Sequence, residues 1–352
     1  MVEGGGAMRY RATAALALAA AGVIWTSGYL AAQRSQTRKG WEPGRGYGWV
    51  WGRNDEVGAL NTLGPADVRA ALELVRQGRV YDLGVPYDRT SYKWPGHSPG
   101  EIITFRSPEG VKRQKDLDFT QGSGNALGTA WHSCSLFISD NVATQIDGLG
   151  HITAGADNHW YNGFREGDWG GDFGVRKCGA ETIPPIVCRS VLIDVAGNRG
   201  VDALPSHTRI TPAMLREALT AQGSRIRPGD AVFIRTGTLR YWGASGADHD
   251  KIREHDSAGI DLDSARWLVE QQGAVLIGSD TSGLEVSPAP EGSGSFNPVH
   301  DYLLVRQGVH IGEFHFLEEL ARDRAYEFAY VCGVNKIRGA TAGFTLRPIA
   351  LR

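Results

Sequence analysis

Apolar residues recur at helical spacing in three segments of the chain. The first segment begins at Pro65 and ends before Gly78, the second covers residues 212–222, and the third covers about residues 262–272. The first two open with proline, which suits the first turn of a helix, and each segment is followed by glycine, which suits the residue after the last turn. These patterns predict three helices.

Short apolar runs bounded by glycine and proline predict the strands. The runs are residues 80–83, 191–195, 231–235, 274–277, 309–313 and 327–332. Several are continuously apolar, which is typical of strands buried on both faces of a sheet. Because helix, glycine and apolar strand follow one another, and no repeat or low-complexity linker divides residues 36–352, we predict one mixed α/β domain there.

Composition and charge narrow the class of protein. The chain has 352 residues, of which 41% are hydrophobic and 22% charged, values that are ordinary for a folded protein. Its 37 Lys and Arg residues nearly balance 39 Asp and Glu residues, for a net charge of -2. Such a balance gives no long-range attraction to a phosphate backbone, so nucleic acid is excluded as an expected partner and a small-molecule substrate is favoured.

The N-terminus has the pattern of an export signal. Arg9 and Arg11 precede an uncharged, mainly apolar run over residues 12–25, and two alanines at 31–32 offer a cleavage point. The run is shorter than the roughly 20 residues of a membrane-spanning helix. We therefore predict a signal at residues 1–35 and a periplasmic or extracellular protein, with an uncleaved N-terminal membrane anchor as the alternative and no further membrane domain.

Export would place the cysteines in an oxidising compartment. Cys178 and Cys188 flank a Pro-Pro loop and could form a disulfide there, but two buried thiols are an equal alternative. No C-x-x-C spacing occurs in the sequence, which argues against a zinc site made of thiolates.

The densest group of polar side chains with metal-binding or proton-transfer chemistry lies in residues 141–151. In extended backbone Gln145 and Asp147 would point to the same face, about 7 Å apart along the chain. Asn141 would join them only if the chain bends between residues 142 and 144, and two glycines before His151 would let that imidazole turn back over the same place. The spacing alone is also consistent with an alternative, an ordinary Asp-Gly turn beside a histidine that has only a structural role.

This segment resembles the signature H-x-G-T-H-x-D-x-x-x-H of the cyclase family, the kynurenine formamidase-like metal-dependent hydrolases. In that family the first two histidines and the aspartate bind metal, and the last histidine is the base. The ligand positions fall on Asn141, Gln145 and Asp147, and the base position falls on His151. Both ligand histidines are therefore amides here, and Ala143 stands where the family has glycine.

The resemblance covers most of the chain, from the motif at residues 51–61 to the ending at residues 347–350. It implies the family's single domain of the swivelling β/β/α-like type, and it implies that His300 and Glu313 supply further metal ligands. Without it, His300 would be interpreted as a surface or capping histidine and Glu313 as an ordinary ion-pair partner. Family members are commonly dimers or larger, so a homo-oligomer is expected.

The implied chemistry is metal-dependent hydrolysis of a C–N bond in a small aromatic amide, formamide or lactam, as in an arylformamidase. Replacing imidazole by amide oxygen favours harder ions, so we expect a divalent metal ion, Mn²⁺ in preference to Zn²⁺. His151 would act as the base because an imidazole titrates near neutral pH. The alternative is an exported small-molecule binding protein of the same fold that has lost the metal.

A second catalytic pattern fails on chemistry. Residues 96–100 read Gly-His-Ser-Pro-Gly, which matches the G-x-S-x-G string of serine hydrolases. That motif needs a backbone N–H on the residue after the serine for the oxyanion hole, and Pro99 has none. The segment is therefore predicted to be an exposed turn.

Overall fold

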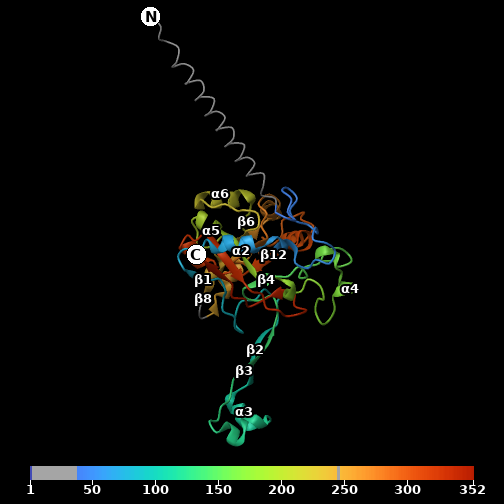
Figure 1. Ribbon diagram of the computed structural model, residues 1–352, viewed down its shortest axis with the longest axis vertical. Coiled ribbons are helices and arrows are strands. Elements are labelled where there is room, and N and C mark those ends of the chain that lie inside the picture. The colour runs from blue at the N-terminus through green and yellow to red at the C-terminus, as the bar shows by residue number, and fades with distance from the viewer. Residues whose placement is uncertain (2–37, 244–245) are drawn as a thin grey trace.

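A nine-stranded sheet of mixed direction runs through the body of the molecule (Figure 1). In spatial order its strands are β1 (Val80–Asp82), β15 (Ile349–Leu351), β13 (Glu327–Cys332), β5 (Ile186–Asp194), β7 (Ala231–Arg235), β11 (Leu276–Ser279), β12 (His310–Glu313), β4 (Gln145–Asp147) and β14 (Ala342–Gly343). The four central strands β5, β7, β11 and β12 are parallel, and the outer strands pair antiparallel. The predicted single mixed α/β domain is confirmed.

The computed structural model describes residues 1, 38–243 and 246–352. The predicted export signal, apart from residue 1, lies outside the described residues. Within the part of the chain that the structure describes, no helix combines the length and the apolarity needed to cross a membrane.

Short helices surround the sheet. They are α2 (Pro65–Leu72), α3 (Pro108–Gln114), α4 (Glu166–Trp169), α5 (Val195–Asn198), α6 (Pro212–Gln222), α7 (His249–His255), α8 (Leu262–Arg266), α9 (Pro298–His300) and α10 (Glu318–Arg322). α2 packs against β5 and β13, and α6 packs against α5 and β5. Two of these helices continue as π-helical turns, α8 into residues 267–271 and α9 into residues 301–307.

The predicted helices form where expected, with one difference in length. α6 ends at Gln222, and Gly223 follows in the left-handed conformation with φ of 65°. The first helix ends at Leu72, well before Gly78. It stops early because the backbone N–H groups of Gln77 and Arg79 bond the carbonyl of Arg352, which draws this segment along the edge of the sheet.

All six predicted strands belong to the central sheet. β7 is buried at every position, as its continuously apolar sequence indicates. β5 begins five residues earlier than the pattern predicts, because residues 186–190 pair with β13. The motif around Asp147 forms the short strand β4 beside β12, so the extended backbone expected there is present.

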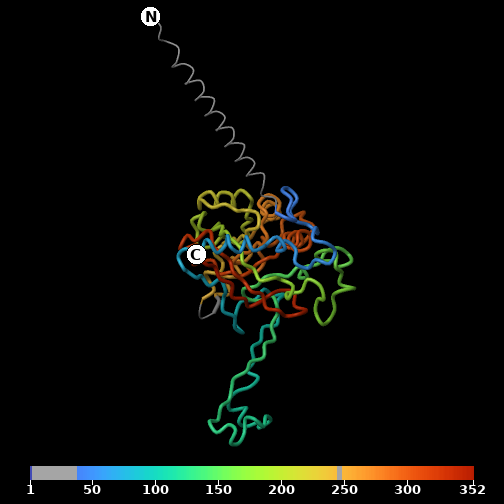
Figure 2. Tube along the Cα trace, viewed as in Figure 1, coloured from blue at the N-terminus to red at the C-terminus, as the bar shows by residue number. Residues whose placement is uncertain are grey.

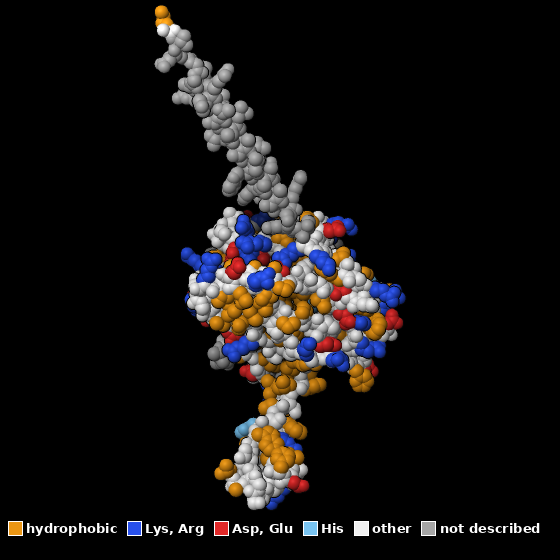
Figure 3. All heavy atoms as spheres, in the orientation of Figure 1, with side chains coloured by type: hydrophobic (Ala, Val, Ile, Leu, Met, Phe, Trp, Pro, Cys, Tyr) orange, Lys and Arg blue, Asp and Glu red, His pale blue; other side chains and the backbone are white. Residues whose placement is uncertain are grey.

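A hairpin arm projects from the body. β2 (Gly100–Arg106) and β3 (Ser133–Ile138) pair antiparallel and carry α3 at the far end, clear of the sheet (Figures 1 and 2). Six large apolar side chains on this arm are exposed: Ile103, Phe105, Phe119, Leu127, Leu136 and Phe137. Figure 3 shows hydrophobic side chains gathered along the arm. The pattern analysis did not identify the arm, whose strands bury little.

The cysteines are unbonded thiols. Cys178 and Cys188 are both buried and free, so the structure has the two-thiol alternative rather than the disulfide. Burial raises the pKa of the Cys188 thiol to about 12, which keeps it protonated and unreactive.

Gly148, between Asp147 and His151, lies where a side chain has no room. A Cβ atom there would sit 2.6 Å from the carbonyl oxygen of Thr341, which accepts a hydrogen bond from the Gly148 N–H. We expect Gly148→Ala to lower the free energy of unfolding by about 1–3 kcal/mol through overpacking. Gly333→Ala is the matched control, because nothing lies within 4 Å of its Cβ position. Equal thermal midpoints for the two variants would contradict this account of the loop.

Candidate metal centre

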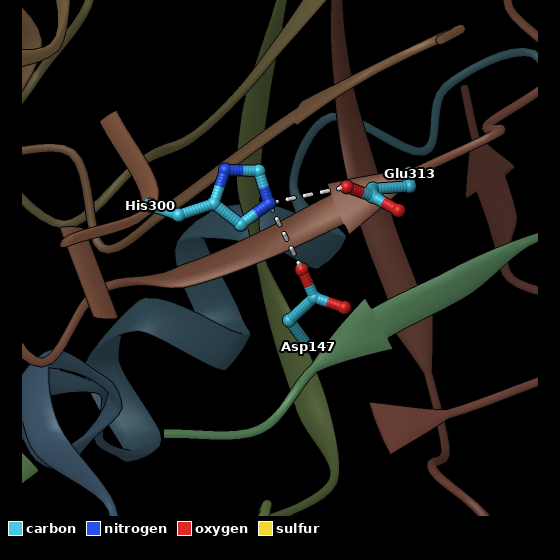
Figure 4. Close-up of side chains that lie close together, drawn as sticks. All are labelled: Asp147, His300 and Glu313. Atoms are coloured by element: carbon cyan, nitrogen blue, oxygen red, sulfur yellow. Dashed lines mark ion pairs between the residues drawn. The ribbon is translucent and has the colours of Figure 1, made fainter. Parts of the chain in front are cut away.

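Three side chains of metal-ligand type converge inside the protein. Asp147 is at the end of β4, Glu313 is at the end of β12, and His300 is in α9 (Figure 4). One ligand atom from each lies within 4.8 Å of the others, and all three residues are buried. Nε2 of His300 is 3.7 Å from Oδ2 of Asp147 and 3.5 Å from Oε1 of Glu313. These distances exceed those of good hydrogen bonds and leave a space between the atoms.

Strand pairing places the two carboxylates together. β4 runs antiparallel to β12, with Gln145 opposite Glu313 and Asp147 opposite Ile311. Directly opposite residues and alternate residues of a strand share one face of a sheet. Gln145, Asp147 and Glu313 therefore point to the same side, although Glu313 lies more than 160 residues further along the chain.

The two amides lie beside this cluster. Nε2 of Gln145 donates to Oε2 of Glu313 at 2.5 Å and to Oδ1 of Asn141 at 3.2 Å. Asn141 reaches this position because the chain bends after it, with Ala143 at a φ of 55°. That left-handed conformation favours glycine, and the family signature has glycine at this place. The bend that the sequence required between residues 142 and 144 is present.

The cluster has the electrostatic character of a cation site. Oδ2 of Asp147 and Oε1 of Gln145 are buried without a hydrogen-bond partner among the described residues. Burial, followed by the nearby charge of Asp147, raises the pKa of Glu313, and burial raises the pKa of Asp147. Two buried carboxylates and unpartnered oxygens are costly unless positive charge lies between them. The residues present therefore fit a divalent metal ion.

Glu285 orients the histidine of the cluster. Its carboxylate accepts hydrogen bonds from the backbone N–H groups of Val299 and His300 and contacts Nδ1 of His300 at 2.5 Å. Nε2 of His300 is thereby left to face the carboxylates, as the orienting carboxylate of a metal-ligand histidine does. Burial would lower the pKa of His300, but Glu285 and Glu313 outweigh it and raise this pKa to about 10.

His151 stands next to the cluster. Its ring centroid is 6.4 Å from that of His300, and its Nδ1 is 3.5 Å from Oγ1 of Thr341. Burial and then the charge of His300 lower the pKa of His151 to about 4. The imidazole is therefore neutral near pH 7, but its pKa lies below the near-neutral value that was expected of it from sequence.

Three further residues of the site were not predicted from sequence. Asp140 accepts hydrogen bonds from Asn141 and from both the backbone and hydroxyl of Thr341, which fixes the start of the bend. His97 lies in the predicted turn at residues 96–100, and Ser98 of that turn is exposed. The ring centroid of His97 is 6.4 Å from that of His151, so His97 belongs to the site. Glu285 is the third. An acidic residue in the mostly apolar run at 284–286 was the available signal for it.

Comparison with known proteins places the chain in a family. The family model described as Putative cyclase matches residues 81–286, which include Asp147, His151 and Glu285. The chain belongs to the Cyclase family. A solved structure of a novel cyclase is 30% identical to this chain. The match covers 86% of this chain and 97% of that structure, with a TM-score of 0.72.

More distant structures share the fold of this chain. Isatin hydrolase A from Ralstonia solanacearum is 18% identical, with a TM-score of 0.53 over 82% of this chain and 98% of its own. Isatin hydrolase A from Labrenzia aggregata is also 18% identical, with a TM-score of 0.51 over 80% of this chain and 98% of its own. A comparison with curated proteins finds no match.

A cavity of the protein reaches His151, the candidate base. It has a volume of about 590 Å³, and His151 forms part of its wall together with the segments 152–155 and 293–298. Its size is in the range of small-molecule pockets.

Metal binding by this protein should depend on pH. The three candidate ligand groups must lose their protons to coordinate an ion, and His300 with its raised pKa holds one near neutral pH. We expect the affinity for Mn²⁺ to increase from about pH 6 to pH 8, by about tenfold per pH unit for each proton released. Calorimetric titration in buffers of different ionisation enthalpy measures both quantities. An affinity that stays constant over this range, without proton release, would contradict the assignment of these ligands.

Proposed function

We propose that this member of the Cyclase family is a metal-dependent hydrolase that cleaves the C–N bond of a small aromatic amide, formamide or lactam. The observation that carries the proposal is the buried cluster of Asp147, His300 and Glu313, with an unpartnered carboxylate oxygen and a neutral imidazole beside it. The proton acceptor beside this cation site, His151, forms part of the wall of a cavity. Hydrolysis of an amide requires both a site that polarises the carbonyl and a group that accepts a proton.

The roles of the side chains follow from their positions. A divalent ion held by Asp147, His300 and Glu313 would polarise the substrate carbonyl and make water more acidic. His151 accepts the proton as the water oxygen bonds to the carbonyl carbon. It then donates that proton to the leaving nitrogen as the C–N bond breaks, so that a carboxylic acid and an amine are formed and His151 is restored. Glu285 holds the His300 ring in place throughout.

Oxygen-rich ligands support manganese as the ion. Apart from His300, the proposed ligands Asp147, Glu313, Gln145 and Asn141 offer oxygen atoms, which Mn²⁺ accepts more readily than Zn²⁺ does. Gln145 now directs its amide nitrogen at Glu313, and its buried Oε1 has no partner. We expect the amide to turn when the ion binds, so that Oε1 faces the metal.

The substrate class is inferred from the cavity and from the fold relatives. Isatin hydrolases share this fold and are named for an aromatic lactam. The cavity of about 590 Å³ beside His151 is large enough for a single aromatic ring with substituents. Aryl formamides and aryl lactams are therefore the first substrates to test.

Two substitutions separate the metal site from the base. We expect His151→Ala to keep stoichiometric metal but to lower kcat about 10²–10⁴-fold, because only proton transfer is lost. Asp147→Ala should lose both metal and activity. Elemental analysis of the purified variants and turnover of formanilide measure the two effects, and His132→Ala, on the exposed part of the arm, is the control.

The rival function makes the opposite prediction. A binding protein of the same fold would contain no stoichiometric divalent metal and would turn over no amide, formamide, lactam or lactone after Mn²⁺ or Zn²⁺ is added. That result with the unaltered protein would contradict the proposed hydrolase and support the metal-free binding protein.

We further propose that the cyclase is exported and forms a homo-oligomer. The basic residues and apolar run of residues 9–25 support export. The exposed apolar arm supports self-association, because an isolated two-stranded hairpin is marginally stable in water and a second copy would cover it. Ile103 and Phe137 lie on one face of the arm and are 57% and 70% exposed.

The arm gives a direct test of assembly. We expect the double variant Ile103→Ser, Phe137→Ser to shift from dimer or larger to monomer in light scattering, because it removes apolar area from the interface. Ile337→Ser, an exposed apolar position on the body, should leave the assembly unchanged. A monomeric parent protein, or a double variant that assembles normally, would refute assembly through the arm.

A further inference from the structure

The cavity that reaches His151 has an uneven charge. In addition to the neutral imidazole of His151, its wall contains three charged side chains, namely Arg266, Arg306 and Asp301. Nε and Nη2 of Arg306 both bond Oδ2 of Asp301 at 2.7 Å, so these two charges neutralise each other. Arg266 is left as the net charge of the wall.

Arg266 has no carboxylate partner within ion-pair distance in the described part of the chain. Its guanidinium carbon lies 5.9 Å from the ring centroid of Tyr302, which supports the side chain by a cation–π contact. Glu270, one helical turn further on, bonds the Tyr302 hydroxyl at 2.8 Å instead. The guanidinium is thus positioned by an aromatic ring, while its N–H donors remain available.

The remainder of the wall is mixed, with apolar side chains such as Leu262 and Phe296 beside polar ones. The loop at residues 293–297 brings Ser293, Ser295 and Asn297 to the cavity, and none of these adds negative charge. An arginine fork binds a carboxylate through two parallel hydrogen bonds, and its charge is more effective where the ligand displaces water.

We propose that Arg266 binds a carboxylate of the substrate, so that the cyclase acts on acidic aryl amides. This inference rests on the proposed hydrolysis and names its substrate class. The scissile bond lies at the His151 end of the cavity, and the carboxylate is held at the Arg266 wall. Arg266 contributes to binding and orientation and takes no part in proton transfer.

Paired substrates test the inference. The 2-, 3- and 4-formamidobenzoates carry a carboxylate at three distances from the formamide, and formanilide carries none. We expect the parent to prefer at least one formamidobenzoate. Arg266→Met should lower kcat/KM for that substrate roughly 10–100-fold, mainly through KM, and should leave formanilide nearly unchanged. Arg266→Lys should recover part of the loss, because it keeps the charge without the fork.

Arg216→Met is the matched control. Arg216 also stacks on an aromatic ring, 5.5 Å from the centroid of Trp267, but it does not line the cavity. It should leave every substrate unaffected. An equal loss on formanilide and on formamidobenzoates with Arg266→Met, or a parent that prefers formanilide, would overturn the inference while the proposed hydrolysis stands.

Binding separates failure of the inference from failure of the proposed function. Calorimetry with 4-acetamidobenzoate and acetanilide, in the parent and in Arg266→Met, needs no turnover. Binding of the acid that is lost in Arg266→Met supports the carboxylate site even if no substrate is hydrolysed. Equal binding of the acid and the neutral amide overturns it.

Discussion

Mutual repulsion between two buried carboxylates is the constraint on which this site depends. Asp147 and Glu313 lie on neighbouring strands, point to the same face and are shielded from water. Two such charges in a poorly solvated place are stable only with protons or with a cation between them. Glu285 and Glu313 raise the pKa of His300, which favours a positive charge on its imidazole, and a divalent ion would supply more positive charge. The geometry is therefore that of a centre held together by opposite charge.

Several contacts around the cluster hold Asp147, Glu313 and His300 in these positions. The β4–β12 pairing sets the separation of the carboxylates, and Glu285 turns His300 toward them. Close backbone approach at Gly148 holds the loop that returns His151 to the cluster. Each of these contacts joins residues that are far apart in sequence or excludes a side chain, so the site is built by tertiary structure and not by the local motif alone.

The sequence predicted the layers of the fold better than it predicted the contents of the site. Continuously apolar runs are a strong local signal, and they located the six main strands of the sheet. The arm was missed because strands 100–106 and 133–138 stand clear of the core and carry no such pattern. The first helix ends early because of bonds to the C-terminus, a tertiary effect that helical periodicity does not contain.

Within the site, spacing anticipated that Gln145 and Asp147 share a face and that the chain bends before them. The convergence of His300 and Glu313 came from family resemblance, since no local pattern links residues so distant. Glu285 was missed because its role depends on a contact with His300 that only the folded chain creates. The orientation of each amide was not predictable from sequence, because oxygen and nitrogen of an amide exchange places by a single rotation.

The central claim is that one divalent cation lies between Asp147, His300 and Glu313. Anomalous X-ray diffraction from crystals of the active protein, recorded above and below the manganese absorption edge, tests it most directly. The account predicts an edge-dependent peak within about 2.0–2.3 Å of an oxygen from each carboxylate and of Nε2 of His300. Active crystals with no metal peak at that position would contradict it.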